Sequence, residues 1–292
     1  NNIKPSYADI NPITYCIDSK SILNAINEDT RLLIPVHFAG QPCEMHEIAI
    51  VGKENDLFII EDAAHAIGSK YVDGSFVGNC KYSDLTIFSF HPVKTITTGE
   101  GGVITTNNKQ LYKRLLMLRS HGMTKDSKVL TKNPGPWYYE MHELGFNYRM
   151  TDIQAAIGIQ QLKKLNAFVL RRREIIKHYN EAFNNIDWLT TPYEKAEVYS
   201  AFHLYVLQFD FDKIGKDRKH VMEELLEAGV GTQVHYIPIH TQPYYQTNFG
   251  YQLGDFPNAE GYYQNAVSIP LYPGMTDSEC EYVIEKILSL KK

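Results

Sequence analysis

The sequence has no long hydrophobic run and no surplus of basic residues, and both absences exclude classes of partner. Its apolar stretches, such as 32–36 and 57–60, are far shorter than the roughly 20 residues that cross a bilayer. The 29 Lys and Arg residues are fewer than the 34 Asp and Glu residues, the net charge is −5, and no segment concentrates basic side chains. We therefore expect neither a membrane nor a nucleic acid as a partner.

Cysteine is also scarce. The four cysteines, Cys16, Cys43, Cys80 and Cys280, lie far apart and form no C-x-x-C pair. This spacing fits neither a disulfide framework nor a zinc knuckle, and it indicates isolated thiols in a reducing compartment. We therefore expect a cytoplasmic protein.

Short apolar runs alternate with amphipathic stretches in the first half of the 292-residue chain. This alternation is typical of a sheet whose strands are joined by helices, and it predicts an α/β fold. The expected strands are 31–38, 57–60, 84–90 and 102–106, and the expected helices are 44–53 and 110–119.

A long helical region follows. Thr151 and Gln154 form a capping box, which predicts a helix that begins there and runs through Leu165. The next expected helix is 168–183. Its apolar residues form a stripe along one side, and the three arginines 171–173 lie outside this stripe. We expect those arginines to lie on a solvated face.

A second alternation of strands and helices follows Pro192. We therefore expect two domains, a large one at 1–165 and a smaller α/β one at 166–292. The remaining expected elements are strands at 202–209 and 232–237 and helices at 217–227 and from Thr276, where Glu279 completes another capping box.

Three residues that can carry chemistry, Asp62, His65 and Lys94, each follow a predicted strand. In open α/β sheets, ligands bind beyond the carboxyl ends of the strands, so these side chains are expected to converge. Taken singly, each has an ordinary alternative: a turn-forming aspartate, a core histidine and a surface lysine.

The surroundings of Lys94 favour a reactive amine. The lysine lies between a predicted strand and a glycine-rich turn, 99–102, where the backbone can pass close to another group. A sheltered lysine loses its proton more easily, and a neutral amine attacks an aldehyde. The glycines fit an ordinary strand-joining turn equally well.

Four segments together resemble one family. They are 61–66 (EDAAHA), 88–94 (FSFHPVK) with 99–102, 119–122 (RSHG) and 145–152 (GFNYRMTD). The resemblance is to the DegT/DnrJ/EryC1/StrS family of sugar aminotransferases that depend on pyridoxal 5′-phosphate (PLP), and it extends from residue 31 to the C-terminus. Within the family, the chain looks most similar to the branch of pseudaminic acid biosynthesis.

The resemblance implies a fold and a cofactor site. The fold would be the type I, aspartate aminotransferase-like architecture, with a mostly parallel sheet in the large domain. Lys94 would bind PLP covalently and move protons, and Asp62 would pair with the pyridine nitrogen. His65 would lie near the cofactor ring, and Ser89 would bind the phosphate. Asn147 would reach the phosphate of a neighbouring subunit's cofactor, so a homodimer is implied.

The resemblance also implies substrates. The amino group would come from glutamate and go to the C4 ketone of a UDP-linked 4-keto-6-deoxy-N-acetylhexose. The expected substrate-binding residues are His91, Arg149, Tyr236 and His240. His235 and His240 could instead suggest a metal pair, but their spacing before a proline, without a nearby carboxylate or cysteine, argues against a metal site.

One part of the family pattern has no counterpart in this sequence. Relatives normally begin with roughly a further quarter of a chain, which carries a Thr- or Ser-rich phosphate loop before a helix N-terminus. We expect the sequence to be a fragment of a longer enzyme. The alternative is a catalytically silent remnant that associates with a full-length paralogue.

Overall fold

The computed structural model describes residues 3–291. The first half of the chain forms a four-stranded sheet in the order β1-β2-β3-β4, in which β1, β2 and β3 are parallel and β4 is antiparallel. The expected mixture of strands and helices is confirmed. The strands are β1 (Leu32–Leu33), β2 (Phe58–Asp62), β3 (Leu85–Ser89) and β4 (Gly102–Thr105).

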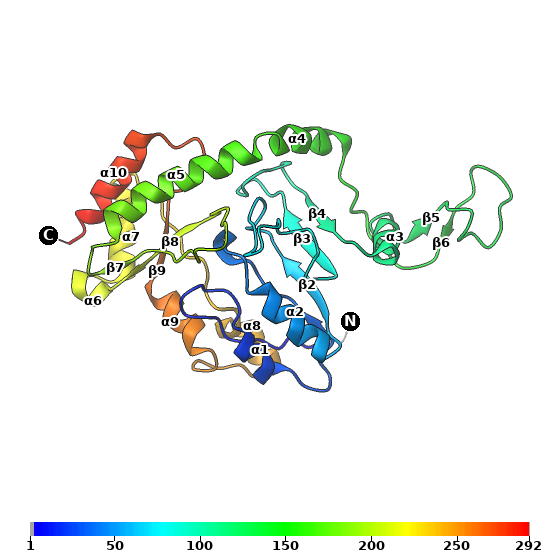
Figure 1. The fold of residues 1–292 in the computed structure, drawn as a ribbon, viewed down its shortest axis with the longest axis horizontal. Coiled ribbons are helices and arrows are strands. Elements are labelled where there is room, and N and C mark those ends of the chain that lie inside the picture. The colour runs from blue at the N-terminus through cyan, green and yellow to red at the C-terminus, as the bar shows by residue number, and fades with distance from the viewer. Residues whose placement is uncertain (1–2, 292) are drawn as a thin grey trace.

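The first strand is much shorter than expected. Only Leu32 and Leu33 pair regularly with β2, and Val36 adds an isolated bridge to Asp62. Pro35 has no backbone N–H, so it cannot donate to a continuous ladder across 31–38. Helix α2 (Met45–Glu54) packs beside this sheet, and α1 (Ser19–Ala25) packs against α2 (Figure 1).

A separate arm projects to the right of the sheet in Figure 1, away from the C-terminal half. It consists of α3 (Lys109–Leu118) and a hairpin of β5 (Met123–Thr124) and β6 (Glu140–Met141). Helix α3 buries none of its residues. The arm therefore contributes little to the core of this protomer.

Helix α4 (Asp152–Leu162) begins as predicted. Thr151 caps it, and the reciprocal bonds between Thr151 and Gln154 confirm the expected capping box. The helix ends before Leu165, and α5 (Leu165–Phe183) then leads into the C-terminal half.

The C-terminal half surrounds a three-stranded antiparallel sheet, β7-β8-β9. Helix α5 packs on α10, and both cover a core in which Tyr179, Phe183, Tyr205 and Phe209 are completely buried. The elements are β7 (Leu189–Thr190), β8 (Tyr205–Phe209), α6 (Phe211–Ile214), α7 (Arg218–Glu227), α8 (Pro243–Phe249), α9 (Pro257–Asn265), β9 (Ala266–Ile269) and α10 (Asp277–Leu288). Two 3₁₀ helices lie at η1 (Phe38–Gly40) and η2 (Ile239–Thr241).

The expectation that arginines 171–173 lie on a solvated face is wrong for Arg172. This side chain is only 4% exposed, because α5 is covered there by the segment before β8 and the segment after β9. Its guanidinium donates hydrogen bonds to the carbonyls of Phe202, His203 and Leu271, at 3.3, 3.2 and 2.9 Å. The sequence pattern predicted that water would hydrate this guanidinium. Carbonyl oxygens from two segments of the chain accept its hydrogen bonds instead.

The expected strand at 232–237 does not form. Within it, only Gln233 bridges to Ser268 of β9, and Pro238 prevents the ladder from continuing. Strand β9, which was not predicted, pairs with β8 instead. The segment 234–238 after Gln233 therefore pairs with no strand, and it lies next to the residues discussed below.

The apolar interior forms two main clusters. One contains buried residues between Cys16 and Val77, and the other contains buried residues between Ile175 and Leu290. We keep the domain boundary near residue 166 as a proposal. No helix within residues 3–291 is both long enough and apolar enough to cross a bilayer.

Candidate active site

Strand β2 ends in two acids with opposite environments, because successive side chains of a strand point to opposite faces. Glu61 is completely buried, and its carboxylate lies 2.7 Å from the Nε2 atom of His37. Tyr71 and Ser83 also donate hydrogen bonds to this carboxylate. Asp62 is only half-buried and is left on the face where the strand ends. The Glu61 network thus anchors the strand end that presents Asp62.

Removal of the Glu61 carboxylate is expected to destabilise the fold. Burial alone would raise the pKa of Glu61, but hydrogen bonds from His37, Ser83 and Tyr71 lower it below its ordinary value of 4.5. We expect Glu61→Ala to lower the free energy of unfolding by about 3 to 5 kcal/mol, since buried partners lose their acceptor. Urea denaturation measures this effect.

The matched control is Glu223→Ala. Glu223 is exposed, 3.8 Å from Lys219, and its replacement should change stability by less than about 0.5 kcal/mol. Because the folded-state pKa of Glu61 is lowered, its contribution is complete above about pH 4.5 and is lost as the pH falls further. Equal effects of both variants at neutral pH would contradict this account.

Lys94 lies in the turn between β3 and β4. The turn is closed by hydrogen bonds from the Phe90 N–H to the Gly101 carbonyl, at 2.8 Å, and from the Thr98 N–H to the Phe90 carbonyl, at 3.0 Å. Lys94 is half-buried there. Burial lowers its pKa, and the nearby Asp62 carboxylate partly opposes the shift. The amine is therefore deprotonated more easily than that of an exposed lysine.

His65 lies on the same side as Lys94. The Ala39 N–H donates to its Nδ1 atom at 3.3 Å, so the imidazole proton is placed on Nε2, 3.5 Å from the Tyr236 hydroxyl. Burial lowers the pKa of His65 to about 3, and the charges of Lys94 and His235 contribute. His65 is therefore neutral at physiological pH.

Gly40 lets the chain pass close to His65. Its φ is +102°, and a Cβ atom there would lie 2.7 Å from the backbone nitrogen of Phe202 and 3.2 Å from the His65 carbonyl oxygen. Any other residue would separate these segments. The contact places the ring of His203 4.5 Å from the ring of His65.

Two further predicted residues flank Lys94. Ser89 is the last residue of β3 and is half-buried, and its hydroxyl oxygen accepts a hydrogen bond from the His91 N–H at 3.4 Å. The His91 side chain is exposed, and its Nε2 atom lies 3.8 Å from a carboxylate oxygen of Glu100. Ser89 thus lies at the strand end, while His91 faces outward.

Asn147 and Arg149 do not join this group within the protomer. Both are exposed on the segment between β6 and α4, and Asn147 forms a bridge with Ser120 of the arm. No hydrogen bond or ion pair in residues 3–291 connects either side chain to Lys94. Their expected roles toward a neighbouring subunit stay predictions.

The two predicted residues of the C-terminal half differ in position. Tyr236 reaches His65, and its pKa is raised by burial and by the Asp62 charge. His240 is buried in η2 and pairs with Glu260 at 2.8 Å. In the described part of the chain, no group of three His, Cys, Asp or Glu residues is arranged to hold a metal ion.

Sequence reasoning missed His203 as a site residue. It placed His235 in the segment 234–240, which resembles the family's substrate-facing loop, with a metal pair as the alternative. His203 precedes β8, and burial, together with His65, Arg172 and Lys94, lowers its pKa to about 2. Burial and the Lys94 charge also lower the pKa of His235. No local motif marks His203, because only the packing of distant segments brings it near His65 and Lys94.

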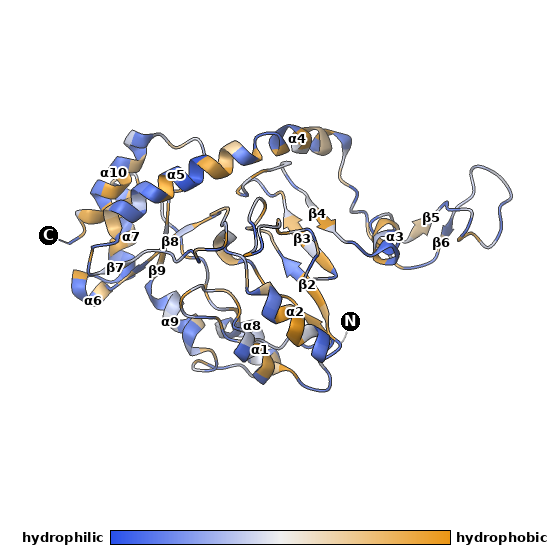
Figure 2. Ribbon diagram, viewed as in Figure 1, coloured by the Kyte–Doolittle hydropathy of each residue, from blue (hydrophilic) through white to orange (hydrophobic). Residues whose placement is uncertain are grey.

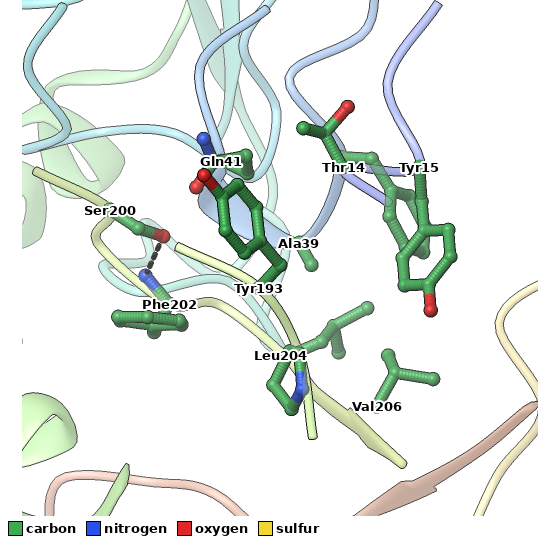
Figure 3. Close-up of a pocket in the computed structure, with 11 residues that line it drawn as sticks. Thr14, Tyr15, Ala39, Gln41, Tyr193, Ser200, Phe202, Leu204 and Val206 are labelled. Atoms are coloured by element: carbon green, nitrogen blue, oxygen red, sulfur yellow. Dashed lines mark hydrogen bonds between the residues drawn. The ribbon is translucent and has the colours of Figure 1, made fainter. Parts of the chain in front are cut away.

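Figure 3 shows an apolar pocket, which is lined by residues of three stretches of the chain, among them Tyr15, Phe38 and Tyr193. Its cavity volume is only about 20 Å³, and its lining contains no carboxylate, amine or imidazole. Ala39 lines it, and the Ser200 hydroxyl accepts a hydrogen bond from the Phe202 N–H at 3.1 Å. Because this pocket offers no acid or base, the chemistry is assigned to the group around Lys94.

The chain is similar to proteins of one family along nearly its whole length. The DegT/DnrJ/EryC1/StrS aminotransferase family matches residues 1–288. The spore coat polysaccharide biosynthesis protein SpsC of Bacillus subtilis is 42% identical over 289 residues, which are 99% of this chain and 74% of SpsC.

Solved structures also match over nearly the whole of this chain. PseC of Helicobacter pylori, an aminotransferase of pseudaminic acid biosynthesis, has a TM-score of 0.90 and 29% identity, over 99% of this chain and 74% of PseC. The putative sugar aminotransferase Spr1654 of Streptococcus pneumoniae, in its PLP form, has a TM-score of 0.88 and 29% identity, over 99% of this chain and 75% of Spr1654. A pyridoxamine phosphate (PMP) form of Spr1654 matches with the same TM-score.

These likenesses agree with the four sequence motifs and with the α/β architecture. The type I fold and the cofactor that the resemblance implied are confirmed. The chain belongs to the DegT/DnrJ/EryC1/StrS aminotransferase family, and it is a sugar aminotransferase with pyridoxal 5′-phosphate as its cofactor.

Proposed function

We propose that this chain transfers an amino group from glutamate to the C4 ketone of a UDP-linked 4-keto-6-deoxy-N-acetylhexose, in the biosynthesis of a pseudaminic acid-type sugar. One observation carries the proposal: a half-buried lysine with a lowered pKa lies near a carboxylate and a neutral histidine. The similarity to PseC supports the substrate class.

The residues around Lys94 fit PLP. A lysine with a lowered pKa can be neutral when it meets the cofactor aldehyde, and Asp62 provides the negative charge that a protonated pyridine requires. When bound, PLP supplies an electron sink for the charge left on a substrate carbon that has lost a proton. Lys94 would hold the cofactor, and Ser89 would donate its hydroxyl to the phosphate.

The chain's own groups then have separate tasks. Lys94 would take a proton from the substrate carbon and return it on the cofactor side, since a neutral amine is both a base and, once protonated, an acid. Asp62 would keep the ring nitrogen protonated. His65, whose Nε2 carries the proton, would donate a hydrogen bond to the cofactor's oxygen while remaining uncharged.

We propose that two copies of the chain form the working unit. Exposed apolar residues gather on α4 and on the arm, and Figure 2 shows hydrophobic residues along α4. Leu144 is 85% exposed and Tyr148 is 73% exposed, which is unusual for large apolar side chains and typical of interaction surfaces. Asn147 and Arg149 lie within this surface, from which they could reach the partner's site.

An amino-transfer assay tests the proposed reaction. The purified chain, loaded with PLP, is incubated with glutamate and the UDP-linked keto sugar. We expect stoichiometric formation of 2-oxoglutarate and of an amino sugar, identified by mass spectrometry and NMR. Formation of 2-oxoglutarate with a different keto sugar, and none with this one, would contradict the substrate assignment.

Mixing two inactive variants tests the shared site. Lys94→Ala and Arg149→Ala should each be inactive alone, but a mixed dimer has one site with both residues intact. Random mixing is expected to restore about a quarter of wild-type activity, because about half of the dimers are mixed and each has one intact site. No recovery, in a preparation shown by light scattering to be dimeric, would place Arg149 outside the partner's site.

A further inference from the structure

A second pocket adjoins the Lys94 group on the side of the C-terminal half. It lies between the segment 231–235 and the end of β9, with His203 and Ser268 in its wall. Its cavity volume is about 200 Å³. Sites for whole small molecules usually measure roughly 300–1,000 Å³, so this pocket has room for one end of a substrate and not for all of it.

One polar atom in this wall lacks a partner. His203 is only 6% exposed. Its Nδ1 atom is buried, so water does not reach it, and it has no hydrogen-bond partner within residues 3–291. His235, by comparison, pairs through Nδ1 with the Ser268 hydroxyl at 2.7 Å. A buried unpaired polar atom is costly, and in a pocket wall it indicates a place for a ligand atom.

The charges that face His203 come from four directions. Arg172 on α5 is cationic, and the pKa values of Lys94 in the β3–β4 turn, of His65 and of His235 are all lowered by burial. The Asp62 carboxylate acts on Lys94. The pocket is lined by imidazole, hydroxyl and amide groups and by no carboxylate, so its wall offers hydrogen-bond donors without a negative charge of its own.

We propose that this pocket binds a carboxylate of the amino-group donor, with His203 Nδ1–H as one donor and the Thr232 hydroxyl as another. The proposal rests on the proposed function, since it assigns a place to the donor of that reaction. A carboxylate oxygen satisfies the unpaired nitrogen, and the nearby Arg172 guanidinium stabilises its charge. A phosphate of the nucleotide would supply the same chemistry, so the test separates the two anions.

Isothermal titration calorimetry of the PLP-loaded chain tests this pocket. Glutarate is titrated, with its neutral diamide and UDP as comparison ligands. We expect glutarate to bind, the diamide to bind at least tenfold more weakly, and UDP to leave the glutarate affinity unchanged. Displacement of glutarate by UDP would overturn the assignment to the amino donor.

Variants locate the binding. His203→Phe keeps a flat ring without the donor, and Thr232→Val keeps the shape without the hydroxyl; each should weaken glutarate about tenfold. His178→Asn on the exposed side of α5 should change nothing. If His203→Phe fails to fold, ¹⁵N-histidine NMR of the wild type still decides, because the His203 Nδ1 signal should move with glutarate and not with the diamide.

The outcomes separate this proposal from the proposed function. Suppose that Lys94 binds PLP, that both variants bind glutarate as tightly as the wild type, and that glutarate does not move the His203 signal. These results refute the pocket assignment alone. A chain that binds glutarate through His203, but transfers no amino group to any keto sugar, refutes the proposed reaction alone.

Discussion

Lys94→Ala is expected to abolish amino transfer, with a loss of at least about 10³-fold in kcat, because one side chain both holds the cofactor and moves the proton. Lys94 is half-buried in a closed turn, and the charge of Asp62 acts on its amine. Steady-state production of 2-oxoglutarate from glutamate measures the loss.

A matched variant excludes a general effect of removing a lysine. Lys177 lies on the exposed side of α5, 3.8 Å from Glu181, and Lys177→Ala should retain wild-type kcat. Circular dichroism and the urea midpoint should show both variants folded. A Lys94→Ala enzyme with more than a tenth of wild-type kcat would contradict the assigned role.

Asp62→Asn is expected to lower kcat by about 10² to 10³-fold, the range for removal of one preorganised electrostatic partner. The substitution keeps the shape of the side chain. The amide oxygen can still accept the hydrogen bond that Asp62 accepts from the Ala64 N–H, at 3.0 Å. Stability should therefore change little while the negative charge is lost.

The loss of that charge also predicts a change at Lys94. Asp62 partly opposes the lowering of the Lys94 pKa by burial, so Asp62→Asn should lower this pKa further. Cofactor capture, followed by absorbance across a pH series, should then extend to lower pH. Asp29→Asn, at an exposed loop position, is the control and should leave kcat and the pH profile unchanged.

Local signals in the sequence predicted several parts of the fold correctly. Both capping boxes, at Thr151 with Gln154 and at Thr276 with Glu279, begin helices as expected. The strands that end at Asp62 and Ser89 also form, because their apolar residues are buried on a sheet. These features depend on neighbours within a few residues.

Features that depend on distant segments could not be predicted. Arg172 is buried because carbonyls near residues 202 and 271 surround it, and His203 meets His65 only because Gly40 allows close packing. The segment 232–237 has a strand-like composition, but only Gln233 pairs with the neighbouring strand, at Ser268 of β9. Tertiary packing decided each of these outcomes.

The account depends most directly on the position at which the cofactor is attached. The purified chain is incubated with PLP, reduced with borohydride, digested and analysed by mass spectrometry. The added mass is expected on the peptide that contains Lys94, and it should be absent from Lys94→Ala. A label on any other lysine, or no label on Lys94 in a folded protein, would contradict the central claim.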